Sequence, residues 1–366
     1  MRIRAVMALL ALGAFALTAC GKAAGPAPSA PAAGAATSGQ AAGPAASGQV
    51  PAQSGAQAGA QRPVRDVSVV LDWYPNAVHS FLYLAQENGY FEQEGLKVTF
   101  KMPAENPTDG IKLVGAGRET FALYYQPDVL VARANEQIPI VSLGAVVRHP
   151  LNAVMARQSK GFKSPRDLEG KTVGYPSIPL NLAIVRTMVK SAGGDPDKVT
   201  MKDIAWDLIP AVATDKVDAI SGGYINHERV LLEKQGIPLT VFRPTDFGVP
   251  DYYELVVITG EKTAREDRAL VEAFWRAAAR GFADMKKDPR HALDVLQKHQ
   301  AKEFPLDREV EEKSIQILLP LMDPGDGRAF GVQDAATWRQ VAEWMKGQGL
   351  LKGDVKPDEA FITAGG

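Results

Sequence analysis

From Asp66 onward the chain alternates short apolar runs with longer segments of helical periodicity. Apolar runs of about four to eight residues are typical of buried strands, and the helical segments between them would connect and cover those strands. This alternation indicates an α/β architecture with a largely parallel sheet. The expected strands cover residues 69–71, 97–102, 120–123, 139–147, 152–156, 171–174, 217–221 and 255–259.

The first strand-loop-helix unit spans residues 69–91. Its apolar run breaks at Asp72, and a helical pattern resumes at Val78 and continues toward Gly89. In open α/β folds, ligands bind beyond the carboxyl ends of the strands, where helix N-termini offer free N–H groups. The loop at residues 72–76 is therefore the first candidate for ligand binding.

The length of the chain points to more than one lobe. A chain of 366 residues is longer than one ordinary hydrophobic core supports, even after its N-terminal segment is set aside. We assign residues 66–156 and 254–366 to a first lobe and residues 157–253 to a second lobe, with two chain crossings between them.

The N-terminus has the pattern of an export signal. Arg2 and Arg4 precede an apolar segment at residues 5–17, and Cys20 follows three residues later. A basic start, a short apolar segment and small residues at its end indicate a signal peptide rather than a spanning helix. Residues 17–20 resemble the bacterial lipobox, so we expect residues 1–20 to be a lipoprotein signal, with cleavage before Cys20 and lipid attachment to it. Because Cys20 is the only cysteine, an intramolecular disulfide is excluded.

Residues 21–65 consist mainly of Ala, Gly, Pro, Ser and Gln. This composition cannot bury enough apolar surface to offset the entropy of ordering, so we expect a flexible tether. Residues 1–65 hold five of the 41 basic residues and none of the 42 acidic ones, which leaves 36 against 42, a formal charge of −6, on the folded part. An acidic domain without basic runs is a poor candidate for nucleic-acid binding.

Aromatic, amide and carboxylate side chains recur at the ends of the expected strands. Aromatic planes with hydrogen-bonding edges suit a flat, neutral or weakly basic heteroaromatic ligand, whereas a phosphate or sulfonate would require Arg, Lys or a glycine-rich cradle. The candidate ligand-binding residues are Trp73, Asn76, His79, Tyr124, Tyr175, Tyr224, Asn226, Glu228, Tyr252 and Glu254.

Metal binding and nucleophilic catalysis have little support in the sequence. His79, His149 and His227 lie in or near the candidate loops, but no pair has a chelating spacing on one helix. The chain has no P-loop, no Gly-x-Ser-x-Gly motif and no Cys-x-x-Cys motif. We therefore expect no metal and no cofactor, and we interpret His79 as a residue of the ligand site or of its packing.

Six segments together resemble the thiamine-pyrimidine precursor binding proteins of ABC importers. They are LDWYPNAVH (71–79), YYQPDVLVA (124–132), RHPLNAVM (148–155), KTVGYPSIP (171–179), GGYINHE (222–228) and FGVPDYYELV (247–256). The resemblance implies a type II periplasmic-binding-protein fold, with two α/β lobes that close over a ligand at a hinge. It also implies that Trp73, Asn76, Tyr175, Tyr224, Asn226, Glu228 and Tyr252 border the cleft. Glu228 would accept hydrogen bonds from the aminopyrimidine.

The function implied by this resemblance is solute capture rather than catalysis. We expect a monomeric lipoprotein on the extracytoplasmic face of the membrane. It would bind formylaminopyrimidine or hydroxymethylpyrimidine for thiamine salvage and would deliver it to an ABC permease.

Two alternatives belong to the same superfamily. The pyrimidine synthase branch carries a lysine and a histidine in the segment that matches residues 120–128, whereas this chain has Tyr124 and Asp128 there and no cysteine at residues 247–254. Its enzymatic function is therefore disfavoured. Proteins that bind riboflavin or another flat heterocycle share the opening at residues 71–76, so such a ligand stays open.

Overall fold

The computed structural model describes residues 64–103, 109–325 and 327–364. The predicted signal peptide, Cys20 and the predicted tether as far as residue 63 lie outside these ranges. Arg65, the last residue assigned to the tether, already begins the first strand. Within the described ranges, the model contains no helix with the length and apolar character needed to cross a membrane.

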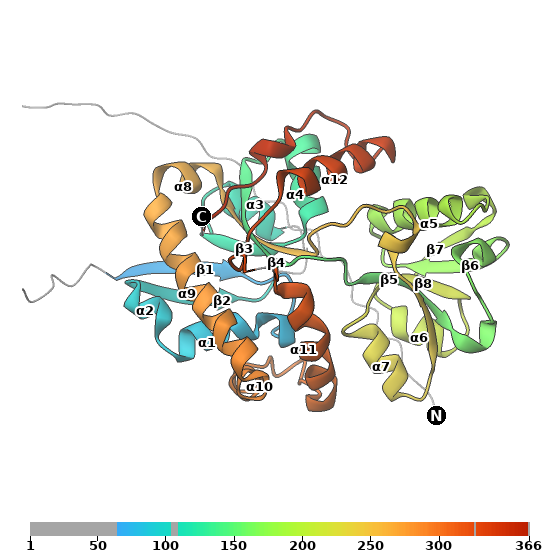
Figure 1. The fold of residues 1–366 in the computed structure, drawn as a ribbon, viewed down its shortest axis with the longest axis horizontal. Helices are drawn as coiled ribbons and strands as arrows, with labels where there is room; N and C mark the ends of the chain where they lie inside the picture. Colours follow the sequence, from blue (N-terminus) through green and yellow to red (C-terminus); the bar gives the residue numbers. More distant parts are fainter. Residues whose placement is uncertain (1–63, 104–108, 326, 365–366) are drawn as a thin grey trace, which may run out of the picture. The chain divides into compact units, whose positions relative to one another are not determined.

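The first lobe is built on a five-stranded mixed sheet with the order β2-β1-β3-β10-β4 (Figure 1). Strand β1 pairs in parallel with β2 and β3, whereas β10 is antiparallel to both β3 and β4. The central position of β10 means that the chain returns from the second lobe to complete this sheet. The strands are β1 (Arg65–Val70), β2 (Leu96–Lys101), β3 (Phe121–Tyr124), β4 (Ile140–Val147) and β10 (Leu255–Gly260).

The second lobe has its own five-stranded sheet, with the order β7-β6-β8-β5-β9. Its strands are β5 (Asn152–Arg157), β6 (Thr172–Tyr175), β7 (Thr200–Asp203), β8 (Ala219–Tyr224) and β9 (Leu239–Phe242). Strands β7 and β9 are not among the strands expected from the sequence. Both are four-residue edge strands with largely exposed or half-buried side chains, so neither has the apolar run that identifies a buried strand.

The predicted boundary of the lobes after residue 156 is wrong. Strand β5 pairs with β8 and β9 of the second sheet, so the first crossing lies between Val147 and Asn152. The error has a physical reason: β4 and β5 are both buried apolar runs, and composition cannot tell which sheet each one joins. The second crossing precedes β10 at Leu255, next to the predicted boundary at residue 254.

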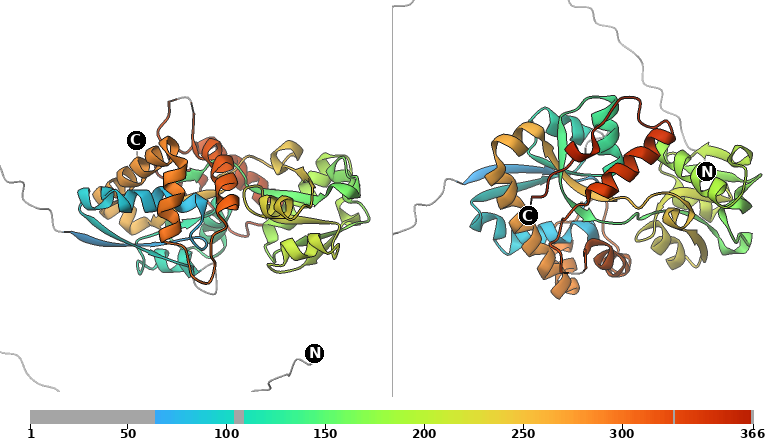
Figure 2. Two further views of the ribbon diagram at one scale, coloured as in Figure 1. Left: turned by 90° about the horizontal axis from the view of Figure 1, so that it is seen from below. Right: turned by 45° about the horizontal axis from the view of Figure 1, so that its top comes forward.

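Helices cover both faces of each sheet (Figures 1 and 2). Alternation along the strands sends Val69 and Val70 into different hydrophobic clusters, which also contain different helices. The cluster of Val69 includes residues of α1 (Ser80–Glu87), α9 (Arg268–Lys287), α10 (Pro289–Lys298), α11 (Arg308–Met322), α6 (Leu208–Ala213) and α7 (Glu228–Lys234). The cluster of Val70 includes residues of α3 (Asp109–Gly115), α4 (Gln126–Asn135), α5 (Pro179–Ser191) and α12 (Ala335–Gly347). The remaining α-helices and the 3-10 helices are α2 (Tyr90–Gln93), α8 (Glu261–Glu266), η1 (Ala77–His79), η2 (Gln158–Lys160), η3 (Pro165–Leu168), η4 (Pro196–Lys198), η5 (Pro244–Phe247) and η6 (Pro357–Glu359).

Helices α1 and α9 pack with almost no space between their backbones at Gly281. A Cβ atom placed on Gly281 would lie 2.0 Å from the carbonyl oxygen of Phe81 and 3.0 Å from the Cβ atom of Ala85. The helix that leads out of the first candidate loop therefore rests directly on the longest helix of the lobe.

We predict that Gly281→Ala lowers the free energy of unfolding by about 1–3 kcal/mol, because the added methyl group overpacks the contact between α1 and α9. Gly347→Ala is the matched control, since a Cβ atom at this helical glycine would meet nothing within 4 Å. Urea unfolding of both variants provides the measurement. Equal stability of the two variants would contradict the close contact.

Candidate functional site

The loop after β1 is fixed by a hydrogen-bonded group around Asp72. The Nε2 atom of His79 lies 2.8 Å from Oδ1 of Asp72, and the hydroxyl of Tyr125 donates to Oδ2 of Asp72 at 3.0 Å. The backbone N–H of Asn76 donates to Nδ1 of His79 at 3.2 Å, which makes Nε2–H the donor to Asp72. Because His79 is fully buried and both of its nitrogens are engaged, it positions the loop.

Asn76 and Trp73 have different environments within this loop. The Oδ1 atom of Asn76 accepts from the backbone N–H of Val78 and caps η1, and its Nδ2 atom donates to the carbonyl of Tyr74. Trp73, in contrast, is 41% exposed. Its indole is the one exposed side chain among residues 72–76.

Glu254 connects the two crossings to the end of β8. Its Oε2 atom accepts from the backbone N–H groups of Leu151 and Asn152 at 2.7 and 3.1 Å, and its Oε1 atom accepts from the hydroxyl of Tyr224 at 2.9 Å. Burial raises the pKa of this carboxyl group, although the hydrogen bonds from Asn152, Tyr224 and Leu151 lower it in part. Glu254 is thus a connecting residue of the hinge.

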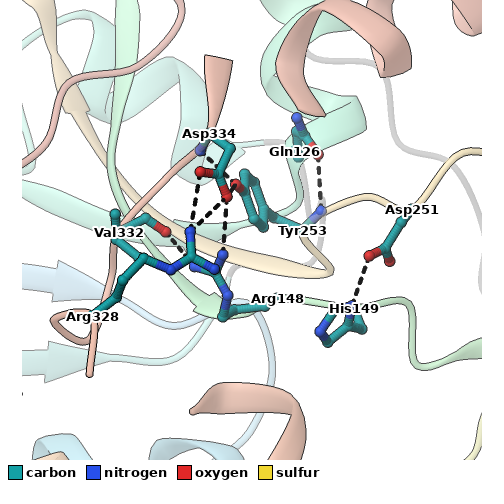
Figure 3. Close-up of polar contacts among 8 residues, drawn as sticks. All are labelled: Gln126, Arg148, His149, Asp251, Tyr253, Arg328, Val332 and Asp334. Carbon is teal, nitrogen blue, oxygen red and sulfur yellow. Dashed lines mark hydrogen bonds and ion pairs between the residues drawn. The ribbon is translucent and has the colours of Figure 1, made fainter. Parts of the chain in front are cut away.

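On the side of the first lobe, both crossings are attached to the C-terminal part of the chain (Figure 3). Arg148 of the first crossing donates to Oδ2 of Asp334 at 3.1 Å, and the backbone N–H of Asp334 donates to the hydroxyl of Tyr253 at 2.7 Å. His149 and Asp251 link the two crossings directly, with 2.7 Å between Nδ1 and Oδ2. Both crossings are therefore held to Asp334 and to each other.

Glu228 begins α7 directly after the loop that ends β8. Its Oε2 atom accepts from the backbone N–H of Tyr224 at 2.8 Å, and its Oε1 atom lies 2.9 Å from Nδ1 of His227. Burial opposes ionisation of Glu228, but the hydrogen bond and the charge of His227, with backbone donors, hold its pKa below the usual value. The pKa of His227 is raised: burial lowers it, but the hydrogen bond and the charge of Glu228 more than compensate. Both shifts favour the ionic form of the pair.

Helix α11 contributes two contacts that the sequence analysis missed. Glu311 accepts from the backbone N–H of Ala77 at 2.7 Å, and the Nδ2 atom of Asn226 donates to the hydroxyl of Ser314 at 3.0 Å. The first contact stabilises the start of η1, and the second connects the loop after β8 to the first lobe. A carboxylate and a hydroxyl buried on the inner face of a helix were the available signal.

The remaining predicted residues divide between core and loop. Tyr124 packs in a hydrophobic cluster, while the next residue, Tyr125, which leaves the strand in an extended conformation and occupies the N-cap position of α4, reaches Asp72. Tyr252 is 1% exposed, and burial followed by the charge of Glu254 raises its pKa well above the usual value. Tyr175, at the end of β6, is half-buried.

The structure thus forms two groups from the predicted residues. Trp73, Asn76 and His79 share the loop after β1, and a second group surrounds the hinge and the end of β8. The second group consists of Tyr224, Asn226, Glu228, Tyr252 and Glu254. Among the described residues, no group of His, Cys, Asp and Glu side chains is arranged to hold a metal ion.

The chain is similar in sequence to several known proteins. The family model described as NMT1/THI5 like matches residues 76–292. The formylaminopyrimidine-binding protein of Halalkalibacterium halodurans is 46% identical over 84% of this chain and 92% of its own length. The 4-amino-5-hydroxymethyl-2-methylpyrimidine phosphate synthase of Legionella pneumophila is 28% identical over 63% of this chain and 72% of its own length.

Among solved structures, the periplasmic aliphatic sulphonate binding protein SsuA of Escherichia coli has a TM-score of 0.65 and 14% identity. The similarity covers 82% of this chain and 92% of that chain. At this identity the likeness concerns the fold, and it confirms the type II periplasmic-binding-protein fold with two α/β lobes. Since the family model covers more than half of the sequence and a relative at 46% identity aligns with most of it, this chain belongs to the NMT1/THI5-like family.

Proposed function

We propose that the protein is an extracytoplasmic solute-binding component of an ABC importer and that its solute is a thiamine-related aminopyrimidine. The observation that carries this proposal is the 46% identity to a formylaminopyrimidine-binding protein across 92% of that relative's length. A lipid on Cys20 and the tether at residues 21–65 would hold the protein near its permease and so raise its effective concentration there.

The chemistry of the second group of residues supports an aminopyrimidine. An aminopyrimidine has an exocyclic N–H donor beside a ring nitrogen, and the Glu228 carboxylate is held ionised by His227. Hydrogen bonds to an ionised acceptor are stronger than those between neutral groups. The exposed indole of Trp73 adds an aromatic plane on which a pyrimidine ring can stack.

The hinge supports a binding cycle without covalent chemistry. The crossings before β5 and before β10 are joined by Glu254 and by the pair His149 and Asp251, so they would bend together. Closure of two lobes by rotation about such a hinge would sequester a ligand and present a closed surface to a permease. Some members of the family are synthases, but the positions at which that branch carries its lysine and histidine are Tyr124 and Asp128 in this chain. We therefore propose that this member has no catalytic activity.

We predict that formylaminopyrimidine or hydroxymethylpyrimidine stabilises the purified protein more than thiamine or riboflavin does. A ligand present at a hundred times its dissociation constant adds about 2.7 kcal/mol to the free energy of unfolding. Thermal-shift and calorimetric titrations with the four compounds provide the measurement. Stabilisation by riboflavin alone would replace the proposed ligand with a flavin.

We further predict that Glu228→Gln weakens pyrimidine binding by about 10- to 100-fold, because a hydrogen bond to a charged group contributes about 1.5–3 kcal/mol. Glu233→Gln, on the same helix at an exposed position paired with Arg229, is the matched control and should keep wild-type affinity. An unchanged dissociation constant for Glu228→Gln would remove this residue from the site.

Asp128 gives the protein a specific dependence on pH. Burial, with a contribution from the charge of Glu254, raises the pKa of Asp128 from 3.8 to about 7. The folded state therefore binds this proton more tightly than the unfolded chain does. The resulting stabilisation is complete below about pH 4 and is lost as the pH rises through about 7.

Asp128→Asn should lose less free energy of unfolding than the wild type between pH 4 and pH 8, by about 1–3 kcal/mol, because its side chain stays neutral. This range lies below the value for the full pKa shift, since the side chain is only half-buried. Urea unfolding at both pH values provides the measurement, with Asp66→Asn at an 88% exposed position as the control. A difference of the opposite sign would contradict the raised pKa.

A further inference from the structure

Trp206 is a second exposed tryptophan that contacts Trp73. The side chains are 59% and 41% exposed, and their ring centroids lie 5.6 Å apart with an interplanar angle of 47°. Trp73 follows β1 of the first lobe, and Trp206 follows β7 of the second lobe. The two indoles therefore form an aromatic contact between loops of different lobes, and the sequence analysis did not include Trp206 among the site residues.

The loop that carries Trp206 is held in a strained conformation. Ala205 has a φ of 46° and Ser177, in the neighbouring loop after β6, has a φ of 53°, both in a region that residues other than glycine rarely adopt. The carboxylate of Asp203 accepts from the backbone N–H of Ala205 at 2.9 Å and from the hydroxyl of Ser177 at 2.7 Å. A strained backbone conformation persists only where the surrounding structure holds it, and such conformations are common at binding sites.

Trp73 is supported from within its own lobe. Its ring meets the ring of Tyr74 edge to face, with 5.6 Å between centroids, and Tyr74 stacks on Phe304 at 3.7 Å. Phe304, Tyr74 and Trp73 of the first lobe thus form a row of ring contacts that ends at Trp206 of the second lobe. A Trp73 ring held in this way has a defined orientation toward its partner.

We propose that Trp206 is a ligand-exchange residue that covers Trp73 and controls how fast a flat solute enters and leaves. The two indoles are tilted rather than stacked, and a third ring inserted between them would need about 7 Å between their centroids, two van der Waals separations of about 3.5 Å. The centroid separation of 5.6 Å is shorter. A solute that stacks on Trp73 therefore has to displace Trp206, and an aromatic solute replaces the ring contact that it breaks. This inference rests on the proposed function, because it takes the solute to be a heteroaromatic that stacks on Trp73.

The kinetic test compares Trp206→Ala with Trp206→Phe in the full-length protein, with stopped-flow measurement of formylaminopyrimidine exchange. We expect the association rate constant to rise by about tenfold or more in Trp206→Ala, because the solute no longer has to displace the indole, and by less than about threefold in Trp206→Phe, which keeps an aromatic ring. Met102→Ala removes an apolar side chain of similar exposure, 47%, from the first lobe and should leave the rate unchanged. An unchanged association rate constant in Trp206→Ala would overturn the proposal.

A second measurement needs no ligand. Two indoles in contact give an exciton-coupled band in circular dichroism, and we expect Trp73→Phe and Trp206→Phe to abolish the same band. Trp344→Phe should retain it, because Trp344 instead donates to the hydroxyl of Thr187. If the wild type shows this band but binds none of the pyrimidines, the proposed function fails and the contact stands. If pyrimidine binds but neither substitution changes the band, the contact proposed here is wrong and the proposed function stands.

Discussion

The buried carboxylate of Glu254 is the interaction on which the arrangement of the two lobes depends. It stands at the second crossing, accepts two backbone N–H groups of the first crossing and accepts the hydroxyl of Tyr224 at the end of β8. Loss of this carboxylate would leave buried donors without an acceptor, at a cost of about 1–3 kcal/mol for each group. One side chain therefore sets the spacing of the hinge strands and the position of the strand that leads to Glu228.

The same network explains why polar groups are concentrated where the lobes meet. Buried amides continue it into the second lobe: Nδ2 of Asn152 donates to Oδ1 of Asn181 at 2.9 Å, and Oδ1 of Asn152 accepts from the backbone N–H of Gly222 at 3.0 Å. Gly222 has a φ of 103° and packs against the ring of Pro176, so the end of β8 turns where a larger residue would be strained. The loop from Tyr224 to Glu228 thus starts from a rigid point.

The sequence was most informative where neighbouring residues in the chain specify the local structure. Fully buried strands such as β4 and β10 are continuous apolar runs and were predicted, while the exposed or half-buried strands β7 and β9 lack that pattern. Glu228 could be placed at a helix start from the pattern that follows it, although the glycines before it, which were expected to end the strand, lie within β8. Partners distant in the sequence could not be found: the helical pattern of α11 places Glu311 on the buried face, but it does not tell that the carboxylate meets Ala77, 234 positions away.

The position of β10 between β3 and β4 has a consequence for how the chain acquires its structure. The sheet of the first lobe lacks its central antiparallel strand until residue 260 has been synthesised, whereas every strand of the second sheet ends by residue 242. The inserted lobe therefore has a complete sheet before the lobe that encloses it in the sequence. Contacts of such long range slow folding, because the entropy of closing a large loop is lost before the contacts form. A chain of this topology remains unfolded for longer after synthesis, which is compatible with passage through a membrane in an unfolded state.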